Sequence, residues 1–347
     1  MSHEIDLSGF EIRCDLISDE IANNKIDNLI VNKKIYKNIV IEEIVVDYTN
    51  CKLFNKKEGV YITIHFSDIT DFDNRNDVIK IVSKSLKTIL MKKNLIGKKV
   101  LVIGLGNSFS TPDALGPKTI DNIIVTRHLF ELNEIDVEEG YSNVSVVCPG
   151  VFANTGVESS DVVFGIVDRI KPDYMIVIDS LASSTLENVN RIIQITDAGI
   201  APGSGIGNNR KEISQDIFSI PVIAIGVPTV VDAVTIVNDT LKFLMKKISY
   251  NIFNVDNVKN KLVDPNNVNY LGLGYNLDRE ERKKFLGLLG ELDDEEMKDL
   301  INEVLTPIGY NFMVTPKEVD FIIEKLSVVI SKAINSVLHN KVSNLNN

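Results

Sequence analysis

The sequence predicts an α/β fold built on a mixed, mostly parallel sheet flanked by helices. Residues 100–103 and 174–178 are uninterrupted apolar runs rich in β-branched side chains, which is typical of strands buried on both faces of a parallel sheet. Around these runs, strand-like and helix-like patterns alternate along the chain. The length of 347 residues fits a single α/β domain that carries an insertion.

The other elements follow in chain order. The first ~30 residues have no sustained period and are expected to form an arm. Apolar positions at helical spacing predict a helix at about residues 76–95. Further strands are predicted at 38–46, 60–64, 144–147, 191–195 and 221–225, and further helices at about 113–132, 230–245 and 317–338.

The stretch at about residues 250–306 is charged and reads as a helical excursion from the sheet. Its charge runs are expected to be solvated helix faces, with a subunit interface as the alternative.

The composition narrows the possible functions. A net charge of −11 argues against binding to a phosphate backbone, which depends on clustered Lys and Arg. The three cysteines are widely spaced and favour a reducing, cytoplasmic compartment over a disulfide framework. The sequence shows neither a signal peptide nor an apolar run long enough for a membrane span, so no membrane partner is expected.

Two carboxylates follow the most apolar strands. Asp113 comes soon after the strand at residues 100–103, and Asp179 directly follows the strand at residues 174–178. In open α/β sheets, sites form outside the carboxyl ends of the strands, so both carboxylates can lie on one rim. Such a pair can share one proton and perform acid and base chemistry. The alternative is structural, because a carboxylate at position 113 would also stabilise a helix N-terminus.

Other catalytic patterns fit less well. Gly104 and Gly106 follow a strand, but Phe109 stands where a dinucleotide-binding motif needs its third glycine. The Gly-Ser-Gly sequence at residues 203–205 is not the elbow of a serine hydrolase. The glycine-rich residues 203–211, together with Asp197, are expected to border the cleft.

The chain resembles the germination proteases of spore-forming bacteria. The resemblance is carried, in one order along the chain, by residues 104–117, 177–187, 194–214, 226–233 and 313–318. It implies an atypical aspartic endopeptidase that degrades small acid-soluble spore proteins during germination, with Asp113 and Asp179 as its catalytic residues. It also implies a fold similar to that of hydrogenase maturation proteases, no essential metal or other cofactor, a homotetramer and a location in the forespore or spore core.

The resemblance further implies a zymogen that removes its own N-terminal segment. Residues 13–20 resemble the processing site, with cleavage expected between Asp15 and Leu16. Residues 1–15 would then be the propeptide, and residues 16–347 a single peptidase domain with the insertion at about 250–306. The alternative is that this segment is merely an arm.

Two other functions stay open. The first is a nickel-dependent protease of the hydrogenase-maturation type, which needs a histidine as a metal ligand; the sole histidine after Asp179 is His339, in the last predicted helix. The second is a catalytically silent protein that binds the same spore proteins.

Overall fold

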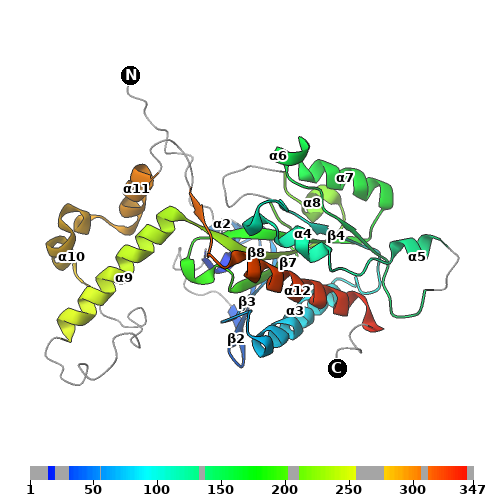
Figure 1. Cartoon of the computed structure of the whole chain (residues 1–347), viewed down its shortest axis with the longest axis horizontal. Helices are drawn as coiled ribbons and strands as arrows, with labels where there is room; N and C mark the ends of the chain where they lie inside the picture. Colours follow the sequence, from blue (N-terminus) through cyan, green and yellow to red (C-terminus); the bar gives the residue numbers. More distant parts are fainter. Residues whose placement is uncertain are drawn as a thin grey trace. The chain divides into compact units, whose positions relative to one another are not determined.

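A mixed β-sheet is the main element of the computed structural model (Figure 1). The structure describes residues 15–19, 31–54, 56–132, 137–201, 211–254, 277–305 and 312–341. The chain divides into two compact units. The larger contains residues 8–230 and 315–347, and residues 231–314 belong to the smaller.

The strands occur in the sheet in the order β1-β2-β3-β7-β8-β6-β4-β5. Their bounds are β1 (Val31–Tyr36), β2 (Ile39–Val46), β3 (Gly59–His65), β4 (Val100–Gly104), β5 (Val144–Val147), β6 (Tyr174–Ser183), β7 (Ile192–Thr196) and β8 (Val222–Asp232). Strand β4 pairs in parallel with both β5 and β6. The neighbouring strands β1, β2, β3, β7 and β8 are all paired antiparallel.

The predicted mixed α/β sheet is confirmed, but its antiparallel part is larger than the sequence predicts. The early strands β1 and β2 form a hairpin in which Tyr36 is paired with Ile39. Strand β3 then pairs with β2 on one side and with β7 on the other. A two-residue connection such as the one between β1 and β2 can join only antiparallel neighbours. Strand β4 is parallel to both β5 and β6, and the candidate carboxylates follow the ends of the paired segments of β4 and β6.

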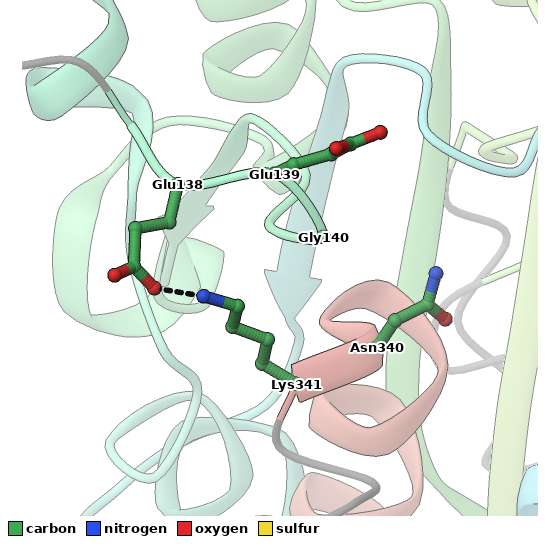
Figure 2. A pocket seen from close by; sticks show the side chains of 5 residues that line it. All are labelled: Glu138, Glu139, Gly140, Asn340 and Lys341. Atoms are coloured by element: carbon green, nitrogen blue, oxygen red, sulfur yellow. Dashed lines mark hydrogen bonds and ion pairs between the residues drawn. The ribbon is translucent and has the colours of Figure 1, made fainter.

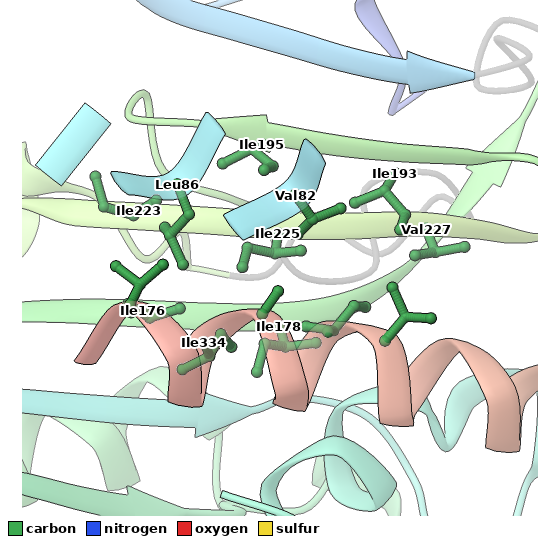
Figure 3. Close-up of a cluster of buried hydrophobic side chains, with 14 of the residues drawn as sticks. Val82, Leu86, Ile176, Ile178, Ile193, Ile195, Ile223, Ile225, Val227 and Ile334 are labelled. Atoms are coloured by element: carbon green, nitrogen blue, oxygen red, sulfur yellow. The ribbon is translucent and has the colours of Figure 1, made fainter. Parts of the chain in front are cut away.

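Three helices cover one face of the sheet: α3 (Phe72–Lys92), α4 (Leu115–Ile120) and α12 (Val319–Leu338). Helices α3 and α12 pack against each other, and Figure 3 shows their side chains over the centre of the sheet. The strand residues labelled there are Ile176, Ile178, Ile193, Ile195, Ile223, Ile225 and Val227. Burial of this apolar surface is the main stabilising contribution to the unit.

The opposite face forms a second, smaller core with helices α7 (Ser159–Ile170) and α8 (Gln215–Phe218). Because side chains alternate along a strand, Ile178 of β6 faces the first core and Val177 faces the second. Asp179 and Leu181 continue the face of Val177. The carboxylate thus belongs to the side of the sheet that carries the smaller core.

Helix boundaries differ from the predicted ones for local reasons. Helix α3 starts earlier than predicted because the Asp71 side chain caps it, accepting a hydrogen bond from Asn74 N at 2.7 Å. The single helix predicted for residues 113–132 is instead the 3₁₀ turn η2 (Thr111–Asp113), α4 and α5 (Arg127–Glu131). Between the two helices, Ile124 N donates to Asn335 Oδ1 and Thr126 N to the Val144 carbonyl, so these amides are unavailable for a continuous helix.

The smaller unit is mainly helical among its described residues. It contains α9 (Ala233–Phe253), α10 (Arg279–Leu286), the 3₁₀ helix η7 (Gly287–Glu291) and α11 (Asp294–Leu305). Strand β9 (Met313–Val314) pairs antiparallel with the last two residues of β8. Helix α9 starts only at residue 233, later than predicted, because β8 continues to Asp232, whose side chain caps the helix. The short helices α2 (Cys51–Phe54) and α6 (Phe152–Thr155) belong to the larger unit.

His339, at the end of α12, is expected to make the stability of the fold depend on pH. It is fully buried, its Nε2 lies 3.2 Å from the Ile124 carbonyl oxygen, and its Nδ1 accepts from Ser142 N. Burial lowers the pKa of the imidazole below its ordinary value of 6.5. The unfolded chain therefore takes up the proton first as the pH falls, and stability that is complete above pH 6.5 decreases below it.

Thermal unfolding measured at about pH 7.5 and about pH 5.5 checks this expectation. The melting temperature of the parent should fall more between the two values than that of His339→Asn. The exposed His128 provides the matched substitution, and His128→Asn should retain the parent's pH dependence. An equal fall in the parent and in His339→Asn would contradict the assignment.

Candidate active site

Close packing of the chain on itself fixes the loop after β4. A side chain on Gly104 would place its Cβ 2.5 Å from the Gly116 carbonyl oxygen, and one on Gly116 would place its Cβ 2.2 Å from the carbonyl oxygen of Leu105. Gly106 has a φ of +111°, and a Cβ there would lie 2.0 Å from the carbonyl oxygen of Asp113. The glycines of this strand-to-helix turn thus allow one chain segment to approach another.

Asp113 is held in the middle of this packing. Its carboxylate oxygen Oδ2 accepts a hydrogen bond from Asn107 N at 2.9 Å, and its main-chain carbonyl accepts from the same amide at 3.0 Å. The side chain of Asn107 in turn accepts from Phe109 N and from Asn154 Nδ2. The half-buried carboxylate therefore has a position defined by a hydrogen-bonded loop.

Asp179 lies on the neighbouring strand at the same end of the sheet. Gly104 of β4 is paired with Ile178 of β6, and Leu105 N donates to the Ile178 carbonyl at 2.8 Å. The Asp179 carboxylate is only 5% exposed and accepts from Ser180 N at 2.9 Å. The turn η2 that carries Asp113 contacts β6. The structure thus brings the two elements that carry the predicted catalytic aspartates together at the carboxyl ends of paired strands.

The chain segment at residues 15–19 is docked at this end of β6. Asp15 N lies 3.4 Å from the Ala182 carbonyl oxygen, and Ala182 N donates to Asp15 Oδ2 at 2.9 Å. The Leu16 side chain is fully buried and packs with Leu181 and Ile192. Both residues of the predicted cleavage site therefore contact the strand that carries Asp179: Asp15 binds the main chain of Ala182, and Leu16 packs on the face that Asp179 and Leu181 share.

Ile17 and Gln194 hold the segment from the other side. Ile17 is fully buried and packs with Ile44, Val46 and Tyr61. Its amide donates to Gln194 Oε1 at 2.9 Å, and Gln194 Nε2 lies 3.5 Å from the Asp15 carbonyl oxygen. Gln194 is not among the site residues predicted from the sequence. A signal was present, because Gln194 is a polar residue within the apolar strand β7.

Of the residues expected to border the cleft, the structure describes Asp197 and Lys211. Asp197 accepts from Val60 N at 2.7 Å and forms an ion pair of 2.9 Å with Lys93. These contacts tie the end of β7 to β3 and to the end of α3. Residues 202–210 lie outside the described residues. Lys211 pairs with Asp161 of α7 at 2.8 Å.

His339 is placed at the other end of the sheet. It forms a β-bridge with Tyr141, which precedes β5, whereas both aspartates follow the strands that carry them. A surface pocket lies beside His339, at the end of the sheet where β5 begins. It is lined by Glu138, Glu139, Gly140, Asn340 and Lys341 (Figure 2). An ion pair between Glu138 and Lys341 crosses it. The histidine on which the nickel alternative depends is therefore remote in the topology from Asp113 and Asp179.

Neither a metal cluster nor a membrane-spanning helix is found in the described part of the chain. Among the residues described, no three His, Cys, Asp or Glu side chains are grouped so that they could hold a metal ion. In the same ranges, no helix combines the length and apolar character needed to cross a bilayer.

Comparison with known proteins identifies the family of the chain. The family model described as germination protease matches residues 11–347. The germination protease of Priestia megaterium is 40% identical over 100% of this chain and 98% of its own length. That of Oceanobacillus iheyensis is 43% identical over 93% and 90%, and that of Bacillus cytotoxicus 41% identical over 99% and 97%. Among solved structures, the [NiFe] hydrogenase maturation protease HycI from Thermococcus kodakarensis KOD1 matches 42% of this chain and 80% of its own at 16% identity, with a TM-score of 0.28.

The class of the protein follows from the family match: it is a peptidase, a hydrolase of peptide bonds. More particularly, the chain belongs to the germination protease family. The predicted resemblance is thereby confirmed.

Proposed function

We propose that the chain is a self-processing endopeptidase that starts the degradation of small acid-soluble spore proteins during germination. It cleaves after an acidic residue and before an apolar one. The observation that carries the proposal is the docking of Asp15 and Leu16 on β6, three residues beyond Asp179. A bond of the expected chemical type is thus docked on the strand that carries a candidate catalytic carboxylate.

One member of the pair Asp113 and Asp179 acts as the general base, and the other acts as the general acid. Two neighbouring carboxylates repel each other when both are ionised, so the pair retains one proton. The ionised member takes a proton from water while the water oxygen attacks the carbonyl carbon of the scissile bond. The protonated member donates its hydrogen to the carbonyl oxygen. The C–N bond then breaks as the leaving nitrogen receives the proton that came from water, while a hydroxyl of the tetrahedral intermediate returns its proton to the other carboxylate, which restores the shared-proton state of the pair.

The contacts of residues 15–17 support the expected cleavage preference. The Asp15 carboxylate accepts from a strand amide, so an acid is favoured before the bond. Leu16 fills an apolar site between Leu181 and Ile192, so an apolar residue is favoured after it. Residues 1–15 are the propeptide in this account, and the catalytic step needs no metal or other cofactor. The enzyme acts as a homotetramer in the forespore or spore core.

Cleavage of a purified small acid-soluble spore protein tests this function. The new N-termini should begin with an apolar residue and follow an acidic one. Tight binding without new termini would instead indicate the silent binding protein. Activity that is lost on chelation and restored by stoichiometric nickel would indicate the maturation-type protease.

A further inference from the structure

A closed ring of hydrogen bonds forms the turn that carries Asp113. The Asn107 amide donates both to Oδ2 and to the main-chain carbonyl of Asp113, at 2.9 and 3.0 Å. The Asp113 amide donates to the Ser110 carbonyl at 2.8 Å, and the Ser110 amide donates to the Asn107 carbonyl at 3.1 Å. Because Asn107 closes the ring and also contacts the carboxylate, a displacement of Asn107 displaces the candidate catalytic group.

The side chain of Asn107 ties this ring to a different part of the chain. Its Oδ1 accepts from Phe109 N at 3.0 Å and from Asn154 Nδ2 at 2.9 Å. The first bond is local, since Phe109 belongs to the same turn, whereas Asn154 lies in α6, beyond β5. Strand β5 is the neighbour of β4 on the side opposite β6. The turn of Asp113 is thus supported from the side of the sheet that does not carry Asp179.

The loop between β5 and α7 holds Asn154 through its own hydrogen bonds. The Asn154 amide donates to the Val151 carbonyl at 2.9 Å, which closes the short turn of α6. At the end of the loop, Ser159 Oγ of α7 donates to the Gly150 carbonyl at 2.7 Å. These bonds fix the place from which the side chain of Asn154 contacts Asn107.

We propose that Asn154 is a positioning residue for catalysis, which acts on Asp113 through the side chain of Asn107. The inference rests on the proposed function. With Asn154 in place, Asn107 is held from two sides, and its main-chain amide stays directed at the Asp113 carboxylate. Without Asn154, the Asn107 side chain keeps its local bond to Phe109 N but loses its tie to α6. The carboxylate then leaves the position that proton transfer with the attacking water requires, which slows the chemical step.

The effect on catalysis should exceed the effect on stability. Asn154 is exposed, and one hydrogen bond between amide side chains contributes little to the free energy of unfolding. The full chain is first allowed to process itself and is then given a peptide of residues 9–24 of its own sequence. Asn154→Ala should lower kcat about fivefold with KM unchanged, because the peptide still binds. Its melting temperature should stay within about 2 °C of the parent.

Two further single substitutions separate positioning from the mere loss of an amide. Asn122→Ala is the matched control, since Asn122 is also exposed and its Nδ2 donates to the Lys118 carbonyl at 3.0 Å, away from the ring. It should leave kcat unchanged. Asn154→Asp keeps the shape of the side chain but turns an acceptor toward Asn107 Oδ1, so it should lower kcat further than Asn154→Ala does.

A double substitution tests the route from Asn154 to Asp113. Asn107→Ala combined with Asn154→Ala should be no slower than Asn107→Ala alone, because the contribution of Asn154 passes through Asn107. Losses that add in the double variant, an unchanged kcat in Asn154→Ala, or a change in its KM alone would overturn the inference and leave the proposed function intact. No cleavage of the peptide or of any spore protein by the parent would overturn the proposed function, and the positioning role with it.

Discussion

Replacement of either candidate catalytic aspartate by asparagine is expected to lower kcat/KM for the peptide of residues 9–24 by roughly 10³-fold. Asparagine has nearly the same shape and can still accept the hydrogen bonds from Asn107 N to Asp113 or from Ser180 N to Asp179. It can neither take a proton from water nor retain one for the carbonyl oxygen. Both variants should therefore fold normally and still bind the peptide, and chromatography of the cleavage products measures the loss.

The control is a carboxylate of the same type outside the site. Asp168 is exposed at the end of α7 and pairs with Lys171 at 2.6 Å. Asp168→Asn should leave kcat/KM unchanged, because a surface ion pair contributes little even to stability. A variant at residue 113 that cleaves as fast as the parent would remove Asp113 from the mechanism, and the same holds for Asp179.

Gly106→Ala is expected to reduce the activity by about 10²-fold through the position of Asp113. The added methyl group would lie 2.0 Å from the Asp113 carbonyl oxygen and 2.9 Å from Oδ1, so the turn that carries the carboxylate must move. Small displacements of a reacting group cause losses of this size, because catalysis depends on a fixed geometry. The measurement is kcat/KM on the same peptide.

A second glycine separates displacement from backbone strain. Gly97 also has a positive φ, of +75°, but its added methyl group would meet nothing within 4 Å. Gly97→Ala should therefore lower the melting temperature through its strained backbone and keep the activity. Full activity in Gly106→Ala would show that the contact between Gly106 and Asp113 does not position the carboxylate.

The sequence was sufficient to predict the part of the site that depends on strand direction. The apolar runs at residues 100–103 and 174–178 identify buried strands, and a carboxylate after each lies at the same edge if the strands are parallel. The register confirms that β4 and β6 are parallel, with Gly104 opposite Ile178. This inference needs only local patterns and one topological rule.

The docking of residues 15–19 could not be predicted from local patterns. Its contacts join residues far apart in the chain, such as Ile17 N and Gln194 Oε1, which are 177 positions apart. The segment has no period of its own, and its order comes from pockets that only the assembled sheet provides. The predicted helix at residues 113–132 was too long for a similar reason, because Asn335 and Val144 bind amides that a local pattern assigns to a helix.

Intact-mass spectrometry of the full chain tests the central claim most directly, namely that Asp113 and Asp179 cut the bond between Asp15 and Leu16 that is docked on β6. On incubation, the parent should yield one shorter species that begins at Leu16, while Asp113→Asn and Asp179→Asn should both keep the full mass. A species beginning at Leu16 in either variant, formed at the rate of the parent, would contradict the claim.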